Sequence, residues 1–166
     1  CIRATEESHP GAGWLVGVTN DERTSYVRRL RRFEKKGCVR VVSMPEKRAH
    51  FYRALDVLVS PVYSGGVADE LMEAAATRVA SVAYDRAGAS AVIADGQTGR
   101  LVPAGDTSAM IEAIRAALDH PKRWRDYGMR ARGRSSQRFN RQHVDDQVMR
   151  LYDTVLETKL QSQRTE

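Results

Sequence analysis

The chain has 166 residues, of which 42% are hydrophobic and 29% are charged, a balance typical of a globular domain and not of a disordered segment. No apolar run approaches the roughly 20 residues that a membrane-spanning helix needs, and no signal-peptide pattern opens the chain. The two cysteines, Cys1 and Cys38, form neither a disulfide framework nor a zinc-binding cluster, which favours a reducing setting. Because the chain starts at Cys1 without an initiator methionine, we expect it to be part of a longer protein.

Short apolar runs alternate with amphipathic stretches along the whole chain. Apolar runs that are each followed by a helix indicate an open parallel sheet built from βαβ units, hence an α/β fold. We expect one domain over residues 1–160 and a frayed tail over residues 161–166. Strands are predicted at residues 14–18, 39–43, 57–61, 79–84 and, as a short edge strand, 101–102. Helices are predicted at residues 21–36, 45–55, 67–76, 90–94, 107–119, 121–134 and 140–160.

The formal net charge of +6 has its excess between Lys122 and Arg141, a segment with eight basic residues. Such a run is most often a solvated helix face. The alternative is a surface for anionic lipid headgroups or a polyphosphate. A nucleic-acid-binding module is disfavoured, because the aromatic residues lie at core positions and are not interleaved with the arginines.

The best candidate for a ligand site is the segment from Ser60 to Val67, which follows a strand and opens a helix. Ligands of open α/β sheets bind at the carboxyl ends of the strands. Gly65 and Gly66 allow a close approach of the backbone, and the free N–H groups of the first helical turn suit a phosphate. On these residues alone, Ser64 either binds the ligand or only caps the helix, and the glycines either cradle it or only form the turn.

Glu73 lies about two turns into the same helix, where a carboxylate can accept hydrogen bonds from a ribose diol. The alternative is an exposed helix glutamate. The other residues of the 71–76 segment are apolar and indicate a largely buried helix, in which a carboxylate needs a partner. Asp69 and Glu70 occupy first-turn positions, and we expect them only to complement the helix dipole.

A series of short motifs runs in a fixed order along residues 39–152. They comprise a helix of the form lY..aDv, a strand ending in PS, a glycine-rich loop with a helix of the form EAmA.G.PV, and a later dg.tG.lv segment. The matching residues are 51–61, 65–76, 81–85, Gly88, Ile93, 95–102, Asp106, 138–139 and 151–152. Each motif alone is weak, but together they are specific, and the stretch resembles the group 1 glycosyltransferases, family 4 of the GT-B transferases.

The resemblance implies a Rossmann-like, doubly wound parallel sheet that forms the C-terminal half of a GT-B fold. It also implies retaining transfer of a sugar from a nucleotide-diphosphate sugar to an acceptor, with no metal and no cofactor. In the family, the second Glu of an E-x7-E pair binds the donor ribose, and Glu73 stands at that position. The glycine-rich loop would hold the diphosphate and face the sugar, and the base would lie by the loop after the second strand. The donor-binding residues so implied are Ser43, Met44, Ser64, Gly65, Gly66, Val67 and Glu73.

The chain departs from the family pattern at several positions. Gly65 replaces the first Glu of the pair, which faces the sugar, so no catalytic residue is assigned. Val67 replaces the usual Phe. Arg78 stands in a predicted tight turn where the family has Gly, and the Pro that follows in the family is also replaced.

The family's first strand of this half would precede Cys1, together with the Arg and Lys that pair with the donor phosphates and the whole N-terminal acceptor domain. In the strand order 3-2-1-4-5-6 the absent strand is the central one. We therefore expect a sheet that lacks its middle strand, or one rearranged to close the gap.

The main hypothesis is the donor-binding domain of a cytoplasmic glycosyltransferase that acts on a cell-envelope or exopolysaccharide precursor. The domain would be inactive without its acceptor domain, and the basic segment from Lys122 to Arg141 would touch the inner face of the membrane. The alternative is a degenerate, non-catalytic GT-B-like binding or scaffold domain, because the sugar-facing Glu is absent.

Overall fold

The computed structural model describes residues 1–18, 25–34, 37–62, 68–86 and 88–163. Within these ranges strands and helices alternate, and the strands within each sheet are parallel. The strands are β1 (Trp14–Val18), β2 (Val39–Ser43), β3 (Val57–Ser60), β4 (Ala80–Tyr84) and β5 (Gly99–Val102). The helices are α1 (Ile2–Ser8), α2 (Ser25–Glu34), α3 (Arg48–Arg53), α4 (Asp69–Ala76), α5 (Ala89–Val92), α6 (Thr107–Asp119), α7 (Pro121–Arg138) and α8 (Arg141–Gln163).

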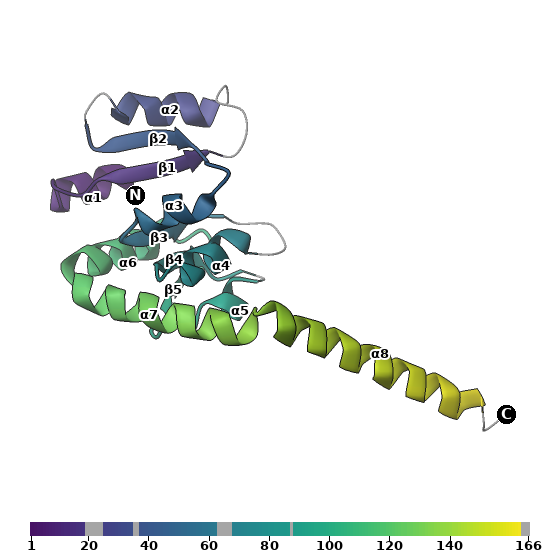
Figure 1. Ribbon diagram of the computed structural model, residues 1–166. Helices are drawn as coiled ribbons and strands as arrows, with labels where there is room; N and C mark the ends of the chain where they lie inside the picture. Colours follow the sequence, from purple (N-terminus) through teal and green to yellow (C-terminus); the bar gives the residue numbers. More distant parts are fainter. Residues whose placement is uncertain (19–24, 35–36, 63–67, 87, 164–166) are drawn as a thin grey trace.

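The strands form two sheets, and the break between them lies between β1 and β3 (Figure 1). β1 pairs with β2, with Trp14 opposite Val39. β4 lies between β3 and β5, with Val57 of β3 opposite Ala80 of β4. In the described ranges no hydrogen-bonded pair joins β1 to β3. The expected strand order puts the absent central strand at this place, so the α/β class with an interrupted parallel sheet is confirmed.

β4 is buried along its whole length, because it is the middle strand of its sheet and helices cover both faces (Figure 1). On one face Val82 lies in a cluster with Met110 of α6 and Trp124 of α7. On the other face Ala83 lies in a cluster with Leu71 of α4. Val82, Met110 and Leu71 have no exposed surface, and burial of each such side chain contributes about 1.5–3 kcal/mol to stability.

Helix ends follow the local sequence signals where those signals are strong. α6 begins at the predicted residue because Asp106 Oδ1 accepts a hydrogen bond from the backbone N–H of Ala109 at 2.9 Å. Gly37 has a φ of +83°, as expected for a glycine after a helix, and donates its N–H to Glu34. α3 is shorter than the predicted helix, because residues 44–47 stay non-helical after β2.

The turn between α4 and β4 is left-handed at Arg78, where φ is +69°. Arg78 is the one non-glycine residue with positive φ among those that the structure describes. A side chain in this conformation costs about 1–2 kcal/mol, a penalty that glycine avoids. Gly128 of α7 packs so closely on the Arg78 carbonyl that a Cβ there would collide with it. The tight turn predicted at Arg78 is therefore present, and it is strained.

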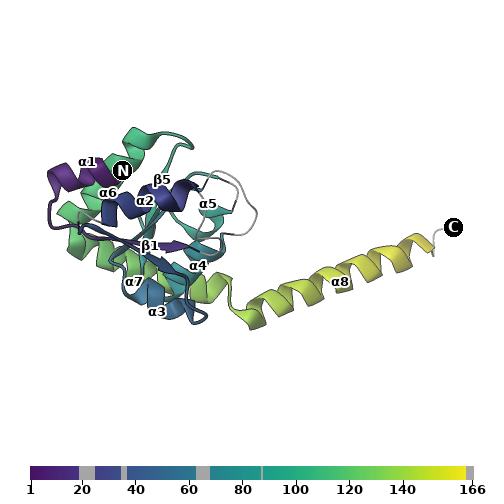
Figure 2. The same ribbon diagram turned by 90° about the horizontal axis from the view of Figure 1, so that it is seen from above.

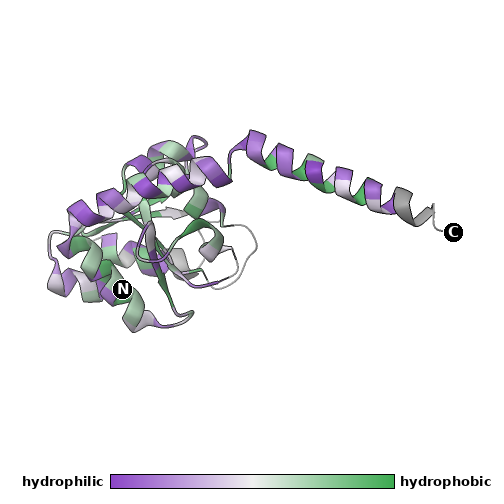
Figure 3. Ribbon diagram, turned by 90° about the horizontal axis from the view of Figure 1, so that it is seen from below, coloured by the Kyte–Doolittle hydropathy of each residue, from purple (hydrophilic) through white to green (hydrophobic). Residues whose placement is uncertain are grey.

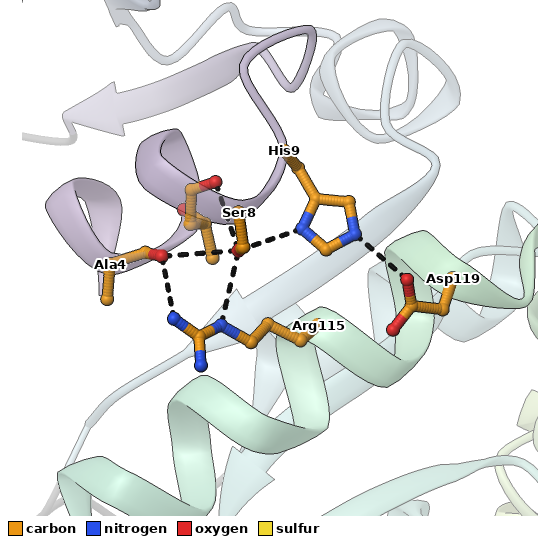
Figure 4. A network of polar contacts seen from close by, with 6 residues as sticks. Ala4, Ser8, His9, Arg115 and Asp119 are labelled. Carbon is orange, nitrogen blue, oxygen red and sulfur yellow. Dashed lines mark hydrogen bonds and ion pairs between the residues drawn. The ribbon is translucent and has the colours of Figure 1, made fainter.

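α1 is fastened to α6, more than a hundred residues away in the sequence (Figures 2 and 4). Arg115 donates from Nη2 to the Ala4 carbonyl at 3.0 Å and from Nε to the Ser8 hydroxyl at 3.2 Å. His9 Nε2 lies 3.0 Å from Asp119 Oδ1, at the end of the same helix. These contacts hold the first helix of the chain beside the last turns of α6.

α8 projects away from the rest of the protein (Figures 1 and 2). Figure 3 shows hydrophobic residues along its length between polar ones. The large apolar side chains exposed on it are Val144, Val148, Met149, Leu151, Tyr152, Val155 and Leu156. Within the described ranges, no helix combines the length and the apolar character that crossing a bilayer requires.

Candidate functional site

A largely buried ion pair joins three chain segments at the carboxyl ends of β3 and β4. Glu70, in the first turn of α4, accepts hydrogen bonds at Oε1 from the Ser60 hydroxyl at 2.9 Å and from Arg86 Nη2 at 2.8 Å. Ser60 ends β3, and Arg86 follows β4 with only 6% of its side chain exposed. The pair therefore holds the start of α4 on two neighbouring strand ends.

The role expected for Glu70 is wrong, because Glu70 does more than complement the helix dipole. Its partners lie 10 and 16 residues away in the sequence. The parallel pairing of β3 with β4 brings them together, and no local pattern encodes that contact. Arg86 Nε is buried without a hydrogen-bond partner in the described ranges, which adds to the dependence of this guanidinium on Glu70.

Glu73 is held by two side chains of α3 and remains open to solvent. Its Oε1 and Oε2 lie 3.4 Å and 3.5 Å from Arg48 Nη1, and the carboxylate accepts a hydrogen bond from the Tyr52 hydroxyl. Burial, reinforced by the hydrogen bond to Glu73, raises the pKa of the Tyr52 hydroxyl well above its ordinary value. Because 37% of the Glu73 side chain is exposed, the carboxylate can still accept hydrogen bonds from a ligand such as a vicinal diol.

Ser43 and Met44 lie at the carboxyl end of β2, close to α3. Ser43 ends β2, and Met44 packs in one cluster with Tyr52 of α3 and Ala74 of α4. Tyr52 belongs to this cluster and also donates a hydrogen bond to Glu73, so α3 connects Met44 with the part of α4 that carries Glu73. Met44 and Glu73 are thus linked through Tyr52, and the predicted roles of Ser43, Met44 and Glu73 in donor binding stay predictions.

The predicted phosphate loop falls where the structure gives no description. Ser64, Gly65, Gly66 and Val67 lie outside the described residues, so their predicted role stays a prediction. The helix after them begins at Asp69, two residues later than predicted. Among the described residues, no group of three or more His, Cys, Asp or Glu side chains is arranged to hold a metal ion.

Several arginines of the basic segment from Lys122 to Arg141 have structural partners. Arg123 Nε donates to the Tyr127 hydroxyl at 2.8 Å. Arg132 donates to the Ala76 carbonyl at 2.7 Å, and Arg134 donates to the carbonyl of Val92 at 3.2 Å. The last two contacts join α7 to α4 and α5, so part of the segment has a structural role and is neither a solvated face nor a surface for an anionic partner.

An interrupted parallel sheet with helices on both faces, and with polar side chains gathered at its strand ends, defines a Rossmann-like domain. A family model described as glycosyl transferases group 1 matches residues 5–120, more than half of the chain. The chain belongs to the group 1 glycosyltransferases.

Curated relatives contain a similar segment. The chain is 38% identical over 90 residues to the alpha-maltose-1-phosphate synthase of Mycolicibacterium smegmatis, a match that covers 51% of this chain and 23% of the relative. It is 36% identical over 111 residues to the phosphatidyl-myo-inositol mannosyltransferase of the same organism, covering 65% of this chain and 28% of the relative. The chain therefore spans about a quarter of the length of these relatives.

Solved glycosyltransferase structures share the fold. Anabaena HepE in complex with UDP superposes with a TM-score of 0.80 at 18% identity, over 92% of this chain and 44% of that one. Sucrose-phosphate synthase from Thermosynechococcus elongatus superposes with a TM-score of 0.78 at 26% identity, over 95% of this chain and 41% of that one. The match confirms the Rossmann-like half of a GT-B fold.

Proposed function

We propose that this chain binds the nucleotide-sugar donor of a retaining glycosyltransferase. The observation that carries the proposal is the Glu73 carboxylate, which Arg48 and Tyr52 orient while more than a third of its side chain stays exposed. A carboxylate fixed in this way accepts two hydrogen bonds from a ribose diol without having to order itself first. HepE was solved with UDP and with UDP-glucose, which supports a nucleotide-sugar as the ligand class.

The acceptor site and the remaining catalytic groups would come from parts of the protein that these residues do not include. The relatives are about four times as long as the matched segment, which supports this division. Gly65 stands where the family places its sugar-facing Glu, so we assign no catalytic residue within the chain. We expect these 166 residues alone to bind the donor without transferring the sugar, with no metal required.

A cell-envelope or exopolysaccharide precursor is the acceptor class that we favour. This chain is similar to the phosphatidyl-myo-inositol mannosyltransferase of M. smegmatis, whose name gives a lipid acceptor. It is also similar to a capsular polysaccharide biosynthesis glycosyltransferase of Staphylococcus aureus. Such acceptors would place the enzyme in the cytoplasm at the inner face of the membrane.

The second candidate is a degenerate GT-B-like domain that binds or scaffolds without catalysis. Gly65 in place of the sugar-facing Glu is the observation that favours it. Nucleotide binding that depends on Glu73, followed by sugar transfer in the full-length protein, would exclude this candidate.

Thermal unfolding with and without millimolar UDP, GDP and ADP tests donor binding. A nucleotide at about 100 times its Kd stabilises the folded state by roughly 2.7 kcal/mol, which raises Tm by a few degrees. Glu73→Gln keeps the volume and the Tyr52 contact but removes the charge, and we expect it to abolish the shift. Glu112→Ala on α6, an exposed carboxylate far along the chain, is the control and should leave the shift unchanged. An equal shift in wild type and Glu73→Gln would contradict the proposed site.

A further inference from the structure

A hollow of about 400 Å³ lies at the amino ends of β3 and β4, the opposite end of this sheet from Glu70 and Ser60. Its volume is in the range of small-molecule sites. The start of β3, the α4–β4 turn and the junction of α6 with α7 all line it. Half-buried apolar side chains contribute to its wall, among them Leu55, Val57 and Leu118.

Three arginines line the hollow, namely Arg53, Arg78 and Arg125, against the single carboxylate of Asp56. None of the three guanidinium groups has a hydrogen-bond or ion-pair partner within the described part of the chain. This distinguishes Arg125 from Arg132 of the same helix, whose guanidinium bonds to a backbone carbonyl. The hollow therefore combines an apolar wall with three guanidinium groups and one carboxylate, and no ion pair within the described ranges joins them.

Arg78 is held at this hollow in an unfavourable backbone conformation, with φ at +69°. The turn is fixed by hydrogen bonds from the Arg78 N–H to the Ala75 carbonyl and from the Val79 N–H to the Ala74 carbonyl, and by the close packing of Gly128. Glycine would satisfy this geometry without strain. Residues with a strained backbone tend to cluster at functional sites, so the strain at Arg78 directs attention to its guanidinium.

The N-terminus of α7 adds to the positive potential of the hollow. Pro121, the first residue of this 18-residue helix, lines the hollow, and the N-cap residue His120 makes no side-chain capping bond. The first N–H groups of the helix therefore have no capping side chain, and the helix dipole favours an anion beside them.

We propose that this hollow binds an organic phosphate ester, with the phosphate on Arg53, Arg78 and Arg125 and the apolar group against Leu55 and Leu118. Guanidinium groups form strong, charge-assisted hydrogen bonds with phosphate. The ester is either a soluble metabolite or the phosphate of a membrane lipid, because both present the same chemistry. The site is separate from the proposed nucleotide site, which lies at the carboxyl ends of the strands.

Titration calorimetry of the whole chain with n-hexyl phosphate, inorganic phosphate and 1-hexanol tests the proposal. Hexyl phosphate should bind at least about tenfold more tightly than either partial ligand, since only it uses both the charges and the apolar wall. Arg78→Gly removes the guanidinium and also the backbone strain, so its Tm should stay within about 3 °C of the wild type. We expect Arg78→Gly and Arg125→Gln each to weaken hexyl phosphate binding about tenfold. Arg138→Gln, with the same charge change at the far end of α7, should leave the affinity unchanged.

Cosedimentation with vesicles separates the two sources of the ester. Binding to phosphatidylglycerol vesicles but not to phosphatidylcholine vesicles, reduced in Arg78→Gly and kept in Arg138→Gln, identifies a lipid phosphate. Saturable binding of hexyl phosphate without vesicle binding identifies a soluble ester. The proposal is overturned by the absence of saturable hexyl phosphate binding, by equal affinity for inorganic phosphate, or by an Arg78→Gly variant that binds as the wild type does.

Discussion

Glu70 neutralises a guanidinium that is almost completely removed from water. Arg86 exposes 6% of its side chain, and Glu70 lies 2.8 Å from its Nη2. Removal of one partner of a buried pair leaves an uncompensated charge, which costs about 3–5 kcal/mol. Because Glu70 is itself 32% exposed, water screens part of this effect. We expect Glu70→Gln to lower the free energy of unfolding by about 2 kcal/mol in urea denaturation.

Asp69 provides the matched control for this prediction. It lies in the same first turn of α4, is exposed, and has no ion-pair partner in the described ranges. Asp69→Asn removes the same charge from the helix N-terminus, so it should cost only about 0.3–1 kcal/mol. If Glu70→Gln lowers the free energy of unfolding no more than Asp69→Asn does, the Arg86 guanidinium is hydrated when Glu70 no longer neutralises it, and the prediction is wrong.

The sequence predicts a role for some residues of the candidate site and not for others. Glu73 stands out because the resemblance assigns a role to its position, and in the structure Tyr52 links it to the cluster on which Met44 packs. Arg48, Tyr52 and Arg86 carry no such signal. Their contacts depend on how α3 packs on α4 and how β3 pairs with β4, and side chains that meet only through tertiary packing are not encoded by local periodicity.

At the scale of elements, strong local signals set the boundaries and weak ones do not. α6 has a capping Asp106 and a clear apolar face, and both of its ends are as predicted. α7 continues four residues past its predicted end at residue 134, because no glycine or proline follows there to stop it and Ser135 stays buried against the protein. The strand β5 is longer than predicted, since pairing with β4 extends it to Gly99.

Replacement by alanine should have opposite effects on stability at the two glycines within α7. At Gly128 a Cβ would collide with the Arg78 carbonyl, a backbone atom that cannot move without disturbing the turn. We expect Gly128→Ala to destabilise the protein by about 1–3 kcal/mol through overpacking. At Gly133 a Cβ meets nothing within 4 Å, so Gly133→Ala should stabilise it by about 0.5–1 kcal/mol through helix propensity. Chemical denaturation of both variants gives the two signs, and a gain in Gly128→Ala would mean that α7 is free to shift away from the turn.

At the scale of the whole molecule, the break between β1 and β3 divides the domain into two sheets that no strand pairing joins in the described ranges. The alternation of strands and helices predicts the α/β class, but only the family's strand order predicts where the sheet is interrupted. The residues predicted to bind the donor lie on both sides of this break. Met44 follows the last residue of β2, whereas Glu73 belongs to α4, which packs on β3 and β4. A ligand that contacts both would link the two sheets.

The two sheets should therefore differ in stability until a nucleotide binds. A two-stranded sheet is marginal alone, and β1 and β2 depend on packing with α2, with α3 and, through Trp14, with the cluster of α6 and α7, whereas β4 is buried and paired on both sides. We expect the amides of β1 and β2 to exchange hydrogen at least about tenfold faster than those of β4 under native conditions, because they open in a separate, less stable unit. Addition of the nucleotide that raises Tm should slow exchange in β2 and α3 more than in β5, which lies away from Glu73. Mass spectrometry of peptides from residues 14–53 and 80–102 measures both effects. Equal protection of the two sheets without ligand would mean that side-chain packing across the break makes the domain one cooperative unit. Equal slowing of exchange in β2, α3 and β5 with ligand would place the nucleotide away from the break between the sheets.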